Sequence, residues 1–147
     1  MMMAVTDDQL ATLRAQLAGN LDEHKRLFAH LDPVAARTGY RSLVSAAFCQ
    51  AVERRFAPDS SAANVIEFVG DVRSRSESAA DEIDPRTAER LILAVYTDES
   101  IGDMDPGTNF GTQILLLAAL IADEQFDSTG LDEFLAQARK LADQWLA

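Results

Sequence analysis

Four carboxylates occur within the sixteen residues "YTDESIGDMDPGTNFG" (96–111), a stretch with three glycines and no lysine or arginine. They are Asp98, Glu99, Asp103 and Asp105. Carboxylate oxygens in a loop are the ligands that Mg²⁺ and Ca²⁺ take, so this segment could hold a cation. An EF-hand loop needs glycine at its sixth position, and that position is Thr108 when counted from Asp103, or Asp103 when counted from Asp98. The spacing therefore excludes an EF-hand.

The net charge of −11 falls almost entirely in one block, because residues 91–138 hold nine acidic side chains and no basic one. Carboxylates follow both apolar runs of this block, where we expect helices to end. There they oppose the helix dipole, which costs roughly 0.3–1 kcal/mol each when exposed. We predict that they form an acidic surface for a basic protein partner, made by Asp98, Glu99, Asp103, Asp105, Asp123, Glu124 and Asp127.

Internal pairing with arginines, or ordinary solvation of the acidic block, is the alternative. Eleven of the thirteen basic residues are arginines, which suit directed pairing with carboxylates. In this hypothesis arginines from the first half of the chain fold over the acidic residues; the candidates are Arg37, Arg41, Arg73, Arg75 and Arg86.

Histidine and cysteine give no catalytic pattern. His24 and His30 are six residues apart, about 120° around a helix, so they cannot bind one metal together. No Glu-x-x-His pair, Gly-x-Ser-x-Gly elbow or P-loop occurs. Cys49 has no base at helical spacing that would lower its pKa. We predict no catalytic residue, no metal ligand and no cofactor, with His24 in a packing role and Cys49 as a structural or surface thiol.

Length and composition suit one globular domain. The chain has 147 residues, of which 48% are hydrophobic. The excess of acidic residues argues against nucleic-acid binding, which needs lysine and arginine on phosphates. The longest apolar run (114–122) is too short to span a bilayer. The start of the chain lacks a basic signal-peptide region, and its one cysteine fits a reducing compartment, so we expect a cytoplasmic protein. The Ala/Arg/Asp-rich composition is typical of a bacterial genome of high GC content.

Apolar residues recur at helical spacing throughout, which predicts an all-α fold. We expect about six helices in a single domain over 1–147, with mostly antiparallel neighbours. The first runs from about Thr6 to Leu31 with a bend at residues 19–20. The others begin near Tyr40, Ser60, Pro85, Pro106 and Ser128. The helix over 106–123 is apolar all round, so we place it at the centre of the bundle, or alternatively at a homodimer interface.

These patterns favour a non-enzymatic interaction or regulatory module that uses the acidic face of residues 91–138. The second hypothesis is a small-molecule or metal-dependent enzyme with a carboxylate-lined site near Asp98, Asp103 and Asp105. The third is a homo-oligomeric helical scaffold built around the apolar helix.

Overall fold

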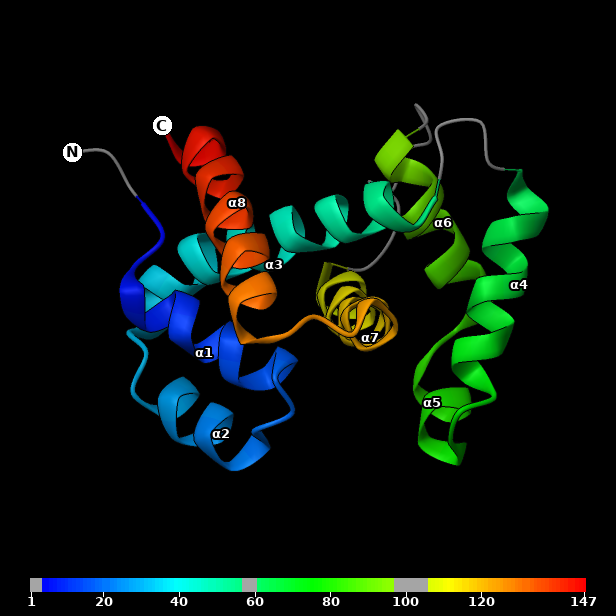
Figure 1. The fold of residues 1–147 in the computed structure, drawn as a ribbon, viewed down its shortest axis with the longest axis horizontal. Helices are drawn as coiled ribbons and strands as arrows, with labels where there is room; N and C mark the ends of the chain where they lie inside the picture. Colours follow the sequence, from blue (N-terminus) through cyan, green and yellow to red (C-terminus); the bar gives the residue numbers. More distant parts are fainter. Residues whose placement is uncertain (1–3, 57–60, 97–105) are drawn as a thin grey trace. The chain divides into compact units, whose positions relative to one another are not determined.

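The computed structural model describes residues 4–56, 61–96 and 106–147, and within these ranges the protein is all-α with no strand, as predicted. Eight helices lie in the described residues (Figure 1). They are α1 (Asp7–Leu17), α2 (Leu21–Ala29), α3 (Pro33–Arg55), α4 (Ala62–Arg73), α5 (Glu77–Glu82), α6 (Pro85–Tyr96), α7 (Pro106–Glu124) and α8 (Ser128–Leu146).

The count exceeds the predicted six because two expected helices are each divided. Gly19 adopts a left-handed φ of 82°, which ends α1, and the side chain of Asn20 then caps α2. Instead of one bent helix from Thr6 to Leu31, the chain therefore forms α1 and α2. The helix expected from Ser60 is also divided. Helix α4 ends at Arg73, and Ser76 caps the short helix α5 by accepting a hydrogen bond from the amide of Ala79 at 3.0 Å.

Two compact units make up the chain: one consists of Met1–Ala47 and Ile121–Ala147, and the other of Phe48–Leu120. The first contains α1, α2, the first part of α3, the last turn of α7 and α8. The second contains the rest of α3 and α7 together with α4, α5 and α6. The single domain, the antiparallel neighbours and the central place of the helix over 106–123 stay predictions.

In the first unit, α1 packs against α2 and α8 (Figure 1). Its core contains Leu13, Leu43, Phe134 and Leu135, all at most 4% exposed. Polar contacts join the two ends of the chain across this unit. The amide of Val5 donates to Asp143 at 2.8 Å, and Arg139 donates to Asp7 Oδ1 and to the carbonyl of Val5, both at 2.7 Å.

A close approach of helices occurs at Gly39 of α3. The side chain of Gln9, buried in α1, accepts a hydrogen bond from the amide of Thr6, and Thr6 Oγ1 accepts one from the amide of Gln9, both at 3.1 Å. This capping box fixes the amide end of Gln9 so close to Gly39 that a Cβ on residue 39 would overlap it, at 2.9 Å from Nε2 and nearer still to Oε1. A Cβ on residue 39 would therefore force the side-chain amide of Gln9 to move.

In the second unit, α4 packs against α5 and α6, with Val65, Phe68, Leu91 and Ile92 buried. Arg73 at the end of α4 donates from Nε to the carbonyl of Ile83 at 2.8 Å and from Nη2 to that of Ala80 at 3.0 Å. Since α5 has no buried residue of its own, these bonds and the buried side chain of Ile83 hold the segment to α4.

Helix α6 begins as predicted, with Asp84 before Pro85. Asp84 Oδ2 accepts hydrogen bonds from the amide and the hydroxyl of Thr87, each at 2.9 Å, and these bonds lower the pKa of the Asp84 carboxyl. The stabilisation from this cap is therefore lost as the pH falls through the folded-state pKa. Helix α7 begins at Pro106, also as predicted, and no residue from Thr112 to Ile121 is exposed.

Candidate functional site

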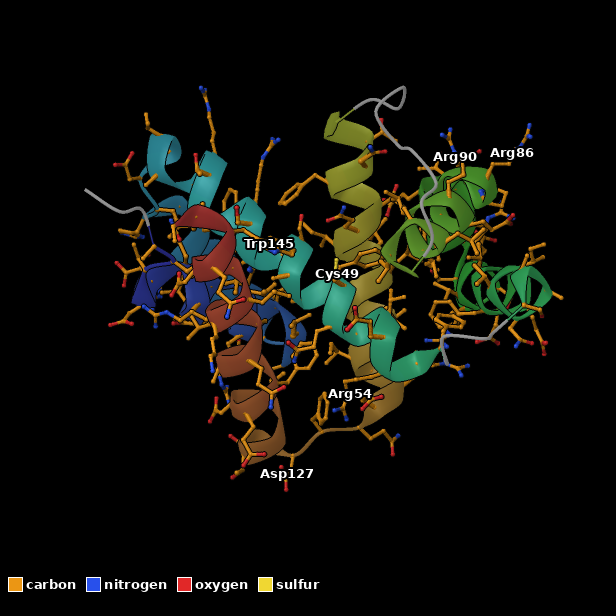
Figure 2. All side chains as sticks on the ribbon, turned by 90° about the horizontal axis from the view of Figure 1, so that it is seen from above. Cys49, Arg54, Arg86, Arg90, Asp127 and Trp145 are labelled. Carbon is orange, nitrogen blue, oxygen red and sulfur yellow. The ribbon has the colours of Figure 1, made fainter. Side chains whose placement is uncertain are left out.

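The structure describes three of the seven residues of the predicted acidic surface. Asp98, Glu99, Asp103 and Asp105 lie outside the described residues. Asp123 and Glu124 belong to the last turn of α7, as predicted, and Asp127 precedes the first residue of α8 (Figure 2). The described part of the candidate site is therefore the corner between α7 and α8.

A short turn shapes this corner. Gln125 has a φ of 52°, in the left-handed region, and it ends α7 at Glu124. Phe126 then packs its ring 5.6 Å from that of Phe134. Asp127 accepts a hydrogen bond from the amide of Gly130 at 2.7 Å and so caps α8. Asp127, predicted as a binding carboxylate, thus has a structural bond at one of its oxygens.

A groove of about 430 Å³ opens beside the turn, between the end of α1, the end of α7 and the start of α8. Its apolar lining comes from Leu17, Ala18, Ile121, Ala122, Phe126 and Leu131, and its polar lining from Arg14, Gln125, Asp127 and Ser128. Ligand pockets in proteins begin at roughly 300 Å³, so a space of this size admits a large side chain or a small molecule. All of its lining belongs to the first unit.

Arg14 is the cation at the polar end of the groove. Its Nε lies 2.5 Å from Asp132 Oδ1, and its Nη2 donates to Ser128 Oγ at 2.8 Å. The side chain of Arg14 is 34% exposed and that of Asp132 is 60% exposed, so the pair is worth at most about 1 kcal/mol. Its main effect is to orient the guanidinium along the groove wall.

Two of the arginines expected to neutralise the acidic block have partners elsewhere. Arg73 donates to main-chain carbonyls, and Arg75 binds Asp71 at 2.8 Å. Arg14, which is not among the predicted candidates, contacts Asp132 near the acidic corner. It lies three residues before Leu17 on α1, and nothing in the local sequence shows that α1 passes beside α8.

His24 is half-buried and His30 is exposed, as predicted. His24 Nδ1 lies 2.8 Å from the carbonyl of Thr12 and joins α2 to α1, and His30 Nδ1 lies 2.7 Å from the carbonyl of Arg26. Within residues 4–56, 61–96 and 106–147, no group of three or more His, Cys, Asp or Glu side chains could hold a metal ion. The carboxylate-lined enzyme site near Asp98, Asp103 and Asp105 lies outside these ranges.

Cys49 lies in the second half of α3 and is half-buried (Figure 2). Burial and then the charge of Glu53 raise the pKa of its thiol from 9.0 to about 11. We expect native Cys49 to react with iodoacetamide slowly at pH 8, where only about one thiol in a thousand would be ionised. The rate should rise about tenfold per pH unit up to the folded-state pKa.

The control for this prediction is the same protein in urea, which should react much faster at pH 8. Glu53→Gln should speed the native reaction modestly, because it removes the second cause of the raised pKa. Since the folded state keeps the proton to higher pH, the stabilisation from Cys49 is complete below pH 9.0 and is lost as the pH rises to about 11. Equal native and unfolded rates at pH 8 would contradict this assignment.

Comparison of the chain with protein-family models, with curated proteins and with solved structures finds no match. Among the described helices, none is both long and apolar enough to cross a membrane. The chemistry of the groove is therefore the basis for assigning a function.

Proposed function

We propose that this protein is a non-enzymatic interaction module that binds a basic, amphipathic segment of a partner protein at the groove between α1, α7 and α8. The partner's apolar side chain enters the groove, and its lysines or arginines face the carboxylates around it. The observation that carries the proposal is that a groove lined by six apolar and four polar residues lies at the acidic corner of the chain.

The charge of the corner supports a basic partner. Residues 121–133 contain five carboxylates and no basic residue, and Arg14 contributes one opposing charge from α1. An excess of negative charge steers an oppositely charged partner and fixes its orientation more than it adds affinity. Association should therefore be sensitive to salt.

The composition of the groove supports binding over catalysis. Its described lining contains no His, Cys, Lys or Glu, so proton transfer would fall to Asp127, which caps α8. Ser128 Oγ interacts with the Arg14 guanidinium, which cannot act as a base. Apolar and polar residues together also line protein-binding surfaces.

The test uses a fluorescent synthetic peptide with leucines at helical spacing and lysines on the other face. We expect its anisotropy to report binding at about 50 mM salt and at least about tenfold weaker binding at about 500 mM. Filling the groove with Ala122→Trp should weaken binding about tenfold or more, because the new ring occupies the space that the peptide needs.

Ala63→Trp is the matched control, because Ala63 is an exposed alanine of α4 in the other unit. The double variant Asp123→Asn, Glu133→Gln should bind more weakly at low salt and show less salt dependence. A peptide with glutamates in place of the lysines should not bind. Equal affinity for both peptides, or equal effects of Ala122→Trp and Ala63→Trp on binding, would contradict the proposal.

A further inference from the structure

The second unit has a polar depression of its own, between the end of α3 and one side of α4. Its volume is about 450 Å³, and its whole lining belongs to this unit. The α4 residues of the lining are spaced three and four apart, which places them on one side of the helix. The depression shares no residue with the groove at the α7–α8 corner. It is lined by Arg55, Phe56, Asn64, Glu67, Phe68 and Asp71.

Arg55 is held at this depression by two aromatic rings. Its guanidinium carbon lies 5.7 Å from the ring centroid of Phe56 and 5.4 Å from that of Phe68. The two rings meet edge to face with centroids 5.5 Å apart, and both are buried. Cation–π contacts orient a guanidinium but use none of its five N–H donors. Since no described residue forms an ion pair with Arg55, these donors are available to a bound anion.

The carboxylates of the depression come from α4. Glu67 is exposed, and no described residue pairs with it. Asp71 Oδ2 lies 2.8 Å from the guanidinium of Arg75, so the charge of Asp71 is already balanced. Neither carboxylate forms an ion pair with Arg55, although all three side chains line the same space. The depression therefore has one unbalanced charge of each sign, on Arg55 and on Glu67.

We propose that this depression binds a free α-amino acid in its zwitterionic form. The carboxylate of the ligand accepts hydrogen bonds from the planar fork of Arg55, and its ammonium group donates to Glu67. The side-chain amide of Asn64, on the same side of α4 as Glu67, donates to the ligand carboxylate.

The two unbalanced charges explain why the ligand carries both groups. An anion without an ammonium group would leave Glu67 unpaired, and a cation without a carboxylate would leave Arg55 unpaired. The side chain of the amino acid is small or polar, because Phe56 is 5% exposed and Phe68 is 3% exposed, which leaves little apolar surface to contact.

L-Alanine is the probe, and nuclear magnetic resonance of the isotope-labelled full chain is the measurement. We expect alanine to shift the signals of the Arg55 Nε–H and of the Asn64 side-chain amide, with a dissociation constant of about 1 mM. Propionate lacks the ammonium group and ethylamine lacks the carboxylate. At the same ionic strength each should bind at least about tenfold more weakly than alanine.

Two variants test the assigned roles, with the backbone amides of α4 as the readout. Arg55→Met keeps an unbranched chain over the rings but removes the donors, and Glu67→Gln removes the charge that holds the ammonium group. Each should weaken alanine binding about tenfold or more. Arg86→Met and Glu82→Gln are the matched controls, because both residues are exposed in the same unit and lie outside the depression. Circular dichroism checks that each variant is folded.

Propionate or ethylamine that binds as tightly as alanine would overturn the amino-acid site, because one charge would then suffice. So would the absence of any shift at about 20 mM alanine, or equal effects of Arg55→Met and Arg86→Met. The inference does not rest on the proposed function. Ala122→Trp in the groove of the other unit should leave alanine binding unchanged, so either proposal can fail without the other.

Discussion

Gly39→Ala should destabilise the first unit by about 1–3 kcal/mol, although alanine normally stabilises a helix relative to glycine by about 1 kcal/mol. The added Cβ would overlap the side-chain amide of Gln9, so Gln9 has to leave its position. Leaving it also breaks the hydrogen bond to the amide of Thr6, which costs about 1 kcal/mol of helix capping. The measurement is the urea midpoint of unfolding followed by circular dichroism.

Gly70 and Gly111 are the matched controls, since a Cβ at either meets nothing within 4 Å. Alanine at these helical positions should stabilise the protein by up to about 1 kcal/mol. The pair Gln9→Ala, Gly39→Ala should be more stable than the sum of the two single changes predicts, because removing the Gln9 side chain makes room for the Cβ. A Gly39→Ala protein as stable as Gly70→Ala would show that Gln9 moves freely.

Arg73→Met should destabilise the second unit by about 2–4 kcal/mol, because two carbonyl oxygens lose a charged donor while the aliphatic packing is kept. The segment from α5 to Ile83 depends on these bonds, at 2.8 Å and 3.0 Å, since α5 buries no residue of its own. Hydrogen exchange should locate the effect: the amides of Ala79 and Ile83 should lose protection before the rest of the unit.

Arg86→Met is the control for charge and size. Arg86 projects from the first turn of α6 (Figure 2), it is exposed, and the described residues give it no ion pair. Its loss should change the free energy of unfolding by no more than about 0.5 kcal/mol. Comparable losses for Arg73→Met and Arg86→Met would mean that overall charge, and not the two carbonyl bonds, decides the stability.

The presence of most helices and the first residues of several can be predicted from the sequence, because they depend on residues that are near one another in the chain. Asp84 with Pro85 predicts the start of α6, and Pro106 and Ser128 predict those of α7 and α8. The same Asp-Pro signal is present at Asp32 and Pro33, where the amide of Val34 donates to Asp32 at 3.0 Å. That signal places the start of α3 at Pro33, whereas the apolar pattern alone puts it near Tyr40.

The candidate site can be predicted only in part, because a groove depends on which helices meet. The acidic end of α7 is evident from Asp123 and Glu124 in the sequence. The third wall, from Arg14 to Ala18, comes from a helix about a hundred residues earlier. No local sequence pattern predicts that such distant segments meet. The left-handed turn at Gln125 could not be predicted either, because the residue is not the glycine that usually marks such a turn.

The division of the first unit between both ends of the chain has a consequence for synthesis on the ribosome. Residues 48–120 form a continuous unit and can complete their contacts once they have emerged. The other unit has to wait for Ile121–Ala147, because Val5 bonds to Asp143 and Asp7 to Arg139. Contacts of such long sequence separation are slow to form. The newly made amino-terminal helices, with α2 among them, would therefore spend the longest time exposed to chaperones.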